Sequence, residues 1–357
     1  MTNSSLLALC GLLLATTSAL TAQTTVSVPC NLDNTLYQSA TGNLSNGKGP
    51  SVFSGVTATG SIRRALLRFD VAGTLPANAV VLSAVVNLNV VQSTVFLPTP
   101  ATGHRVLRAW GEGNSTASGP GGGGTAAATG DATWLHTFWS TSFWTTPGGD
   151  FAAAPSFTLA MPGLGAGSSN PSEQAAADVQ SWLNNPSQNF GWLIKIADET
   201  VPSTARRISS RESATTPPTP PTLSVTYLLP GQVGIVGIGC PVGSGTFQDA
   251  YVGTPTGGTT IQIVQTNAPV GTIGLNYLSL GANPAGVPLL PGCSIWLPLS
   301  QPLIAGNVFL TNAVGGATSP FPLPSGFPGF LITTQAVAID ASPLGFTLSN
   351  AAVLVLN

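Results

Sequence analysis

Six of the ten basic residues in this chain lie in two short segments, residues 62–70 and 206–212. All six are arginines, and no Lys or Arg follows Arg211. The guanidinium group of arginine binds carboxylate and sulfate groups through two parallel hydrogen bonds. Because cations are scarce elsewhere, these segments mark the place where a site for an acidic ligand can be built.

Residues 64–70 alternate as a β-strand, in which successive side chains point to opposite faces. One face belongs to a core and carries Ala65, Leu67, Phe69 and Val71. The other carries Arg64, Leu66, Arg68 and Asp70, with positions on one face spaced by about 7 Å. The same alternation puts Arg207, Ser209 and Arg211 on one face of the second segment. If the segments are neighbours, their polar faces form one groove, and the candidate ligand-binding arginines are Arg64, Arg68, Arg207 and Arg211.

A structural role is the alternative for these arginines. Arg68 lies two residues from Asp70 and can pair with it inside the fold. Arg211 directly precedes Glu212 and can do the same. Buried ion pairs of this kind cost desolvation and are kept for specificity as often as for stability. A third possibility is that some of these arginines are simply solvated.

Three tryptophans recur every five residues, at Trp134, Trp139 and Trp144. Flat aromatic faces are what sugar rings stack on, so all three are candidate ligand-binding residues. An odd spacing on a strand puts alternate residues on opposite faces, so the three cannot line one sheet. Either some of them belong to the core or the segment is a loop. His136 within this segment is expected to be a hydrogen-bonded loop residue.

Catalysis has little support. No carboxylates form the recognisable pair that a glycosidase needs, and no nucleophile motif is present. A lyase would need Tyr37 or His136 as a base beside Arg64, and nothing selects either. The cysteine and histidine spacings fit no zinc site. A structural calcium ion, which many β-sandwiches carry, has no supporting ligand spacing, so we expect no catalytic residue, metal or cofactor.

The bulk composition narrows the class of protein. Only 6% of the 357 residues are charged and the net charge is −2, so no long-range field attracts nucleic acid. A hydrophobic content of 43% is too high for a disordered chain. The 42 glycines and 30 prolines suit β-sandwiches with many turns. These features favour an all-β extracellular protein.

The N-terminus indicates secretion. Residues 6–15 form an apolar run too short to span a bilayer, followed by small residues, so residues 1–22 read as a signal peptide. No other segment is expected to insert in a membrane. In an oxidising compartment Cys240 pairs naturally with Cys293. Cys30 is then left as a buried thiol or as one half of an intermolecular bond.

The composition changes sharply near residues 228–231, which suggests two domains, 23–228 and 229–357. All the cations precede this point, and residues 231–357 carry two charges, Asp249 and Asp340. The first domain should contain β-strands and one short helix at about 171–184, with Asn170 as its N-cap. The second should be a β-sandwich with strands near 232–238, 259–266, 275–280, 294–299, 307–311, 330–339 and 347–356.

Several motifs occur in an order that is similar to the DNRLRE-domain family of secreted bacterial proteins. They lie at residues 33–37, 60–70, 75–79, 110–112, 133–134, 178–183, 189–192, 210–212 and 223–227. The resemblance covers about residues 26–228 and implies a jelly-roll β-sandwich like those of carbohydrate-binding modules, some of which bind acidic polysaccharides such as alginate. The Gly-rich insertion at 117–130 departs from the family pattern. Residues 231–357 more weakly resemble C-terminal β-sandwich modules of secreted planctomycete-type proteins.

Together these features predict a secreted, non-catalytic protein, extracellular or on the cell surface, that binds a polysaccharide or cell-surface glycan. The glycan is expected to be acidic because of the arginine segments. A structural or adhesive protein of the cell surface or matrix is the alternative, favoured by the very low charge. A polysaccharide lyase or hydrolase is the third reading.

Overall fold

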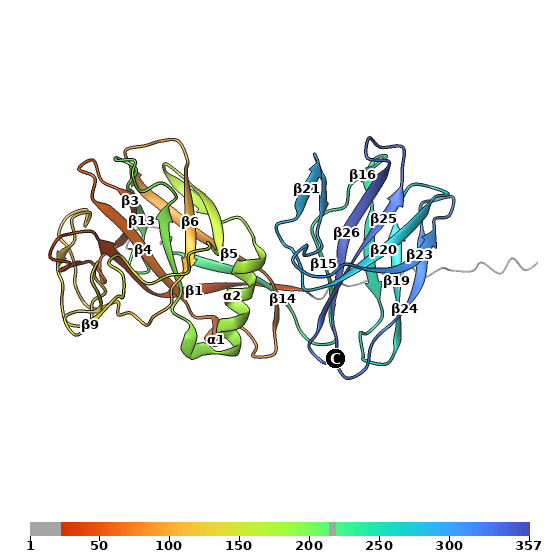
Figure 1. Cartoon of the computed structure of the whole chain (residues 1–357), viewed down its shortest axis with the longest axis horizontal. Coiled ribbons are helices and arrows are strands. Elements are labelled where there is room, and N and C mark those ends of the chain that lie inside the picture. Colours follow the sequence, from red (N-terminus) through yellow and green to blue (C-terminus); the bar gives the residue numbers. More distant parts are fainter. Residues whose placement is uncertain (1–22, 214–218) are drawn as a thin grey trace, which may run out of the picture.

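The computed structural model describes residues 23–213 and 219–357, so the predicted signal peptide at 1–22 lies outside it. The predicted all-β, sandwich-type fold is confirmed. Figure 1 shows two lobes, which we call the N-terminal lobe (residues 23–228) and the C-terminal lobe (residues 229–357). No helix in the described part of the chain is long and apolar enough to cross a membrane.

The N-terminal lobe is built from antiparallel strands in the order β1-β14-β5-β13-β3-β4-β12-β6-β10, with β11 paired to β5. The strands are β1 (Thr24–Tyr37), β2 (Leu44–Ser45), β3 (Ser51–Val56), β4 (Ile62–Phe69), β5 (Val80–Ser93), β6 (Thr99–Arg105), β7 (Thr125–Ala126), β8 (His136–Phe138), β9 (Ser142–Phe143), β10 (Phe157–Met161), β11 (Gly165–Ser168), β12 (Trp192–Ile196), β13 (Arg206–Ser209) and β14 (Thr222–Leu228). Helix α1 (Val71–Thr74) and a 3₁₀ turn (Pro186–Gln188) complete the lobe together with helix α2 (Glu173–Asn184).

Two strands cross from one layer of the sandwich to the other. The start of β1 pairs with β14, and its end pairs with β4. Strand β3 pairs with β13 along Ser51–Ser54 and with β4 only from Gly55 onward. Gly55 has φ +117°, and a Cβ there would lie 2.5 Å from the carbonyl oxygen of Thr204. The crossing in β3 therefore requires glycine at this position.

Helix α2 lies where the sequence predicts it but starts two residues later. Ser172, not Asn170, is its N-cap, and the Ser172 hydroxyl accepts a hydrogen bond from the amide of Ala175. The predicted apolar face is buried, and it packs Trp182 edge-on against Trp192 at 4.5 Å between ring centroids. The four residues predicted for the core face of the first arginine segment are also buried: Ala65, Leu67, Phe69 and Val71.

The C-terminal lobe packs a five-stranded sheet, in the order β15-β26-β25-β20-β23, against a three-stranded one, β18-β19-β24. Its strands are β15 (Val233–Val236), β16 (Pro241–Val242), β17 (Gly245–Thr246), β18 (Gln248–Val252), β19 (Thr260–Thr266), β20 (Ile273–Leu280), β21 (Val287–Leu290), β22 (Cys293–Ile295), β23 (Ile304–Leu310), β24 (Ala317–Pro322), β25 (Leu331–Ile339) and β26 (Phe346–Val355). The seven predicted runs fall on strands. Strands β16, β17, β18, β21 and β24 had no counterpart in the sequence prediction.

The two lobes share an apolar cluster. Leu82 and Leu228 of the N-terminal lobe are buried in one cluster with Val236 and Val353 of the C-terminal lobe. The side chain of Gln23 also accepts a hydrogen bond of 2.9 Å from the amide of Ile235. The lobes are therefore packed against each other as well as joined by the chain.

The C-terminal lobe buries a carboxyl group without a cation. Asp249 is 1% exposed and accepts hydrogen bonds from Gln265 and Thr334, at 2.9 and 3.2 Å. No Lys, Arg or His occurs anywhere in this lobe's sequence. Burial without a counter-charge raises the pKa of Asp249 from 3.8 to about 7.

This raised pKa predicts an unusual pH dependence. The folded state holds a proton on Asp249 that the unfolded chain loses above about pH 4, so this contribution to stability is present below pH 4 and lost as pH rises through 7. Each pH unit in between removes about 1.4 kcal/mol. We expect Asp249→Asn to raise the unfolding free energy at pH 8 and to leave it nearly unchanged at pH 4, measured by urea denaturation.

Asp340→Asn is the matched control, because Asp340 is the other acidic residue of the lobe and lies at a turn. It should change stability little at either pH. An Asp249→Asn effect that is the same at pH 4 and pH 8 would contradict the prediction.

Candidate functional site

The ten basic residues divide according to whether they have a carboxylate partner. Six of them form salt bridges: Lys48, Arg64, Arg105, Arg108, Lys195 and Arg211. Within residues 23–213 and 219–357 the remaining four form none, and these are Arg63, Arg68, Arg206 and Arg207. An arginine without an acid keeps its charge available for a ligand, so this division separates structural cations from candidate binding residues.

Arg64 belongs to the structural group. Its guanidinium group forms two hydrogen bonds to Glu199, at 2.9 and 2.7 Å, and a third to the carbonyl of Gly148. It also lies over the ring of Trp134, 5.0 Å from the centroid. Leu66, predicted on the same polar face, is instead buried in a second apolar cluster. The predicted polar row is wrong here because the long connection between β6 and β10 folds over this face.

Arg68 lies on that same face and donates a hydrogen bond of 3.1 Å to the side chain of Asn31. The predicted ion pair with Asp70 does not form within the described part of the chain. Partial burial lowers the pKa of Arg68. This arginine is therefore held by a neutral amide rather than by an acid.

Arg211 lies outside the strand that was predicted to carry it. Strand β13 ends at Ser209, so the alternation that placed Arg207 and Arg211 on one face fails. The backbone amide of Arg211 donates to Asp33, and its guanidinium group binds both oxygens of Glu112, at 2.6 and 2.5 Å. It also pairs with Glu212, at 2.7 Å, as predicted.

These contacts form a cluster of Asp33, Lys48, Glu112, Arg211 and Glu212, which we call the buried ionic cluster after its two buried carboxylates, Asp33 and Glu112. The other three side chains are partly exposed. Glu112 is 6% exposed and also accepts hydrogen bonds from Lys48, at 2.6 Å, and from the amide of Asp33. Burial works against ionisation here, but the hydrogen bonds from Arg211 and Lys48 prevail and lower the pKa of Glu112. Burial raises the pKa values of Asp33 and Glu212.

The carboxylates of Asp33, Glu112 and Glu212 lie close enough together to hold a metal ion, with ligand atoms within 4.8 Å of one another. However, both oxygens of Glu112 already bind cationic side chains. Two protein cations thus already neutralise the central carboxylate of the three. The cluster joins strand β1, the connection after β6 and the end of β13, so its role is to hold these segments together.

The tryptophan-rich segment forms a loop with a short hairpin, β8–β9, in which residues 140–143 are exposed but two of the three tryptophans are buried. Trp134 and Trp144 belong to the second apolar cluster, and the indole of Trp144 donates to the carbonyl of Thr133. Trp139 is half-buried and packs edge-on against His136, with 4.5 Å between ring centroids. His136 is hydrogen-bonded to Thr133 as expected, but it begins strand β8 rather than lying in a loop. Two of the three candidate tryptophans are therefore core residues.

Four arginines have no carboxylate partner in the described residues, and three of these four line one cavity of about 200 Å³. We call this cavity the arginine pocket. The three arginines are Arg63, Arg206 and Arg207. The remaining wall is formed by Phe53, Thr57, Gln92, Ser93, Thr94, Pro120, Gly122 and Ala205, none of which carries a charge. Three of the ten basic residues of the chain therefore contribute atoms to the wall of one pocket.

Arg207 is the most available of the three. It lies opposite Phe53 in β3 and opposite Gln92 in β5, so the three side chains share one face of the sheet. Its Nε donates to the hydroxyl of Ser51 at 2.8 Å. Its two terminal nitrogens have no hydrogen-bond partner within the described residues, so they can grip an anion with two parallel bonds.

Arg63 and Arg206 are fixed by neutral oxygens. Arg63 lies over the ring of Tyr37, at 4.9 Å, and donates to the carbonyl of Gly122 in the Gly-rich insertion. Arg206 is completely buried and donates to the carbonyls of Pro162, Thr204 and Leu97 and to the hydroxyl of Thr99. Burial lowers the pKa values of both arginines. Carbonyl groups orient these guanidinium groups without neutralising them. The Arg63 group bonds to Gly122 in the pocket wall, whereas the partners of Arg206 lie outside that wall.

Sequence reasoning found Arg207 but missed Arg63 and Arg206. Strand alternation put Arg63 on the core side, yet it pairs with Gly55 where β3 leaves one layer for the other. The sequence feature that could have predicted Arg63 and Arg206 is the pair of adjacent arginines in each segment. Neighbours on a strand point to opposite faces, so each pair must present one guanidinium group on each side.

No protein-family model matches this chain, and the comparison with curated proteins finds no match either. Evidence about the site therefore comes from its own geometry. Of the motif residues that carry the resemblance to the DNRLRE-domain family, Asp33, Glu112, Arg211 and Glu212 lie in the buried ionic cluster, whereas Arg63 lines the arginine pocket.

The cluster makes a prediction about stability. Glu112→Ala leaves Arg211 and Lys48 without their shared acid. Because Glu112 is buried but both cations are partly exposed, the expected cost is about 2 kcal/mol. Urea unfolding of the variant should show that loss in the N-terminal lobe. Asp198→Ala, at an exposed turn, is the control and should change stability by less than about 1 kcal/mol. Equal effects of the two substitutions would refute the structural role of the cluster.

Proposed function

We propose that this protein is a secreted, non-catalytic carbohydrate-binding protein whose N-terminal lobe binds an acidic polysaccharide at the arginine pocket. The observation that carries the proposal is the set of three arginines around one cavity with no carboxylate partner. A carboxylate or sulfate group of a glycan supplies the missing charge. The partner is a polysaccharide or cell-surface glycan, consistent with the low net charge of −2, which disfavours nucleic acid.

The chemistry of the pocket suits an acidic sugar. The free terminal nitrogens of Arg207 offer the two parallel donors that a carboxylate or sulfate prefers. Gln92, Ser93 and Thr94 add an amide and two hydroxyl groups that can bind sugar hydroxyls. Phe53 gives the pocket an apolar surface beside these polar groups. The sandwich-type fold and the resemblance to a family with acidic-polysaccharide binders support the same proposal.

Binding is favoured over cleavage because the pocket lacks a proton-transfer group. Its lining residues include no Asp, Glu, His or Tyr, the usual sources of a general acid or base in glycan-degrading enzymes. The alternative, a structural or adhesive surface protein, draws support from the apolar surface of the C-terminal lobe. That reading predicts tight association with the cell envelope and no affinity for any glycan.

The proposal is tested with the mature chain, residues 23–357, by affinity electrophoresis in gels containing alginate, pectin or a sulfated glycan. We expect at least one acidic polymer to retard the protein, and the effect to weaken as salt is raised. Arg207→Ala should lower the affinity by tenfold or more, because it removes the two free donors.

Arg108→Ala is the matched control. Arg108 is 55% exposed, pairs with Asp150 and lies away from the arginine pocket, so its removal changes the net charge by the same amount. Affinity should stay within about twofold of the wild type. The proposal fails if no acidic glycan binds, or if folded Arg207→Ala binds as tightly as the unmodified chain.

A further inference from the structure

The outer face of the five-stranded sheet in the C-terminal lobe carries a long apolar depression. A cavity of about 430 Å³ is lined by Tyr277, Leu289, Ile295, Leu297, Leu303, Gln335, Val337, Phe346 and Leu348. A second cavity, of about 280 Å³, continues over β20 and β25 toward β23. The two share Tyr277, Val337 and Phe346, so we treat them as one feature and call it the apolar trough.

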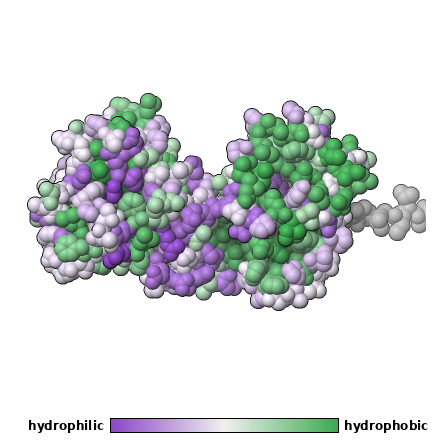
Figure 2. Space-filling model, in the orientation of Figure 1, coloured by the Kyte–Doolittle hydropathy of each residue, from purple (hydrophilic) through white to green (hydrophobic). Residues whose placement is uncertain are grey.

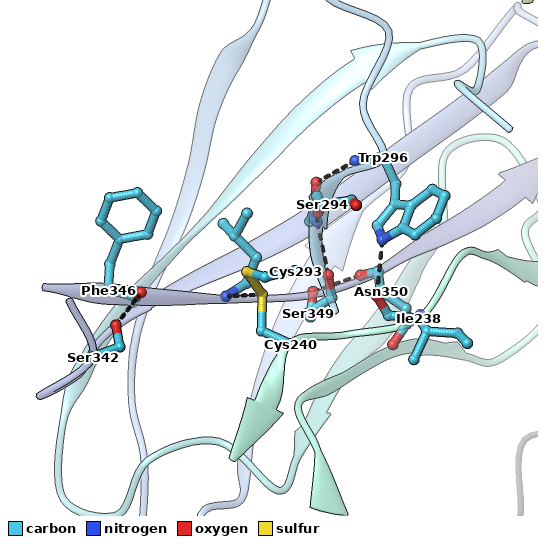
Figure 3. The surroundings of a disulfide bond; sticks show 11 residues. Ile238, Cys240, Cys293, Ser294, Trp296, Ser342, Phe346, Ser349 and Asn350 are labelled. Carbon is cyan, nitrogen blue, oxygen red and sulfur yellow. Dashed lines mark hydrogen bonds between the residues drawn. A yellow bond between two sulfur atoms is a disulfide. The ribbon is translucent and has the colours of Figure 1, made fainter. Parts of the chain in front are cut away.

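The trough is held open by a fixed wall. Its floor comes from β20, β25 and β26, and its wall is the hairpin β21–β22, which carries Leu289 and Ile295. The disulfide between Cys240 and Cys293 ties this hairpin to the strand region before β16, as predicted from the sequence (Figure 3). The wall is therefore covalently attached at Cys293, close to the floor strand β26, whose Leu348 amide donates to the Cys240 sulfur.

Hydrogen bonds strengthen the same fastening. The amide of Trp296 donates to Gln335 at 2.9 Å. The Trp296 indole donates to the carbonyl of Ile238 at 2.9 Å (Figure 3). The side-chain amide of Gln335 in turn donates to the carbonyls of Ser294 and Ser349. The trough is therefore formed before any ligand arrives, which lowers the entropic cost of binding.

The trough offers a ligand almost no polar partner. The amide group of Gln335 is already used in the hydrogen bonds above, which leaves the hydroxyl of Tyr277 as the remaining polar side chain in the lining. The two acidic residues of the lobe, Asp249 and Asp340, are not part of the lining. A sugar, nucleotide or peptide would lose hydrogen bonds to water and gain few in return, whereas an aliphatic chain loses none.

Large apolar side chains surround the trough. Ile273, Ile304, Val308 and Ile339 are each more than half exposed, at 56%, 61%, 69% and 61%. Figure 2 shows hydrophobic residues gathered over the C-terminal lobe, in contrast to the more polar N-terminal lobe. Contiguous apolar surface of this kind in a soluble protein marks an interaction site. Its elongated form matches a single extended chain better than a compact ring.

We infer that the apolar trough binds the acyl chain of one lipid molecule. This inference does not depend on the arginine pocket, since the two sites lie in different lobes and use opposite chemistry. The ligand's affinity should come from burial of methylene groups, so it should rise severalfold with each added carbon until the trough is filled.

The test is isothermal titration of the mature chain with octanoate, decanoate and dodecanoate below their micelle concentrations. We expect one site per chain and an affinity that increases with chain length. Val337→Trp places a large ring in the part shared by both cavities and should weaken dodecanoate binding by tenfold or more. Val314→Trp, at an 80% exposed position outside the trough, should leave it unchanged.

Three results would overturn the inference. The first is a folded wild-type chain that binds none of the three fatty acids. The second is equal dodecanoate affinity in Val337→Trp and Val314→Trp. The third is sedimentation showing a dimer that Val337→Trp dissociates, because a second copy would then be the occupant of this face. Glycan binding by the Arg207→Ala and Val337→Trp variants, measured side by side, tells failure at this site from failure at the arginine pocket.

Discussion

The pairing of arginine with carboxylate is the interaction on which the N-terminal lobe depends. In the buried ionic cluster, Arg211 and Lys48 share Glu112, and through it the first strand, the long connection after β6 and the end of β13 are held together. Arg64 performs a similar role with Glu199 beneath the tryptophan-rich loop. In the described residues the remaining four arginines form no salt bridge, and three of them line the arginine pocket.

The two lobes differ in how they use their few charged residues. The N-terminal lobe holds every Lys and Arg, and it combines buried ion pairs with one positively charged pocket. The C-terminal lobe has no basic residue, buries Asp249 in a neutral hydrogen-bond network and exposes apolar side chains around its trough. The apolar cluster that contains Leu228 and Val353 packs the two lobes against each other.

Periodicity predicted the all-β fold, helix α2 and the core face of β4, because these depend on local alternation between apolar and polar residues. Periodicity placed Leu66 wrongly on a polar face. The connection between β6 and β10 covers that face, and a local sequence pattern cannot predict this distant contact. Periodicity also could not assign partners: Glu112 and Glu199 lie 99 and 135 residues from Arg211 and Arg64. The arginine pocket needs the layer crossing at Gly55, a tertiary feature that strand alternation does not encode.

The central claim is that carboxylate pairing decides which arginines are free to bind. Side-chain NMR of the mature chain labelled with ¹⁵N-arginine tests it most directly, with alginate or sulfated oligosaccharides added in turn. The account predicts that the Nε–H signals of Arg207 and Arg63 shift saturably, while those of Arg64 and Arg211 stay in place. Shifts confined to Arg64 and Arg211, with Arg207 and Arg63 unaffected, would contradict it.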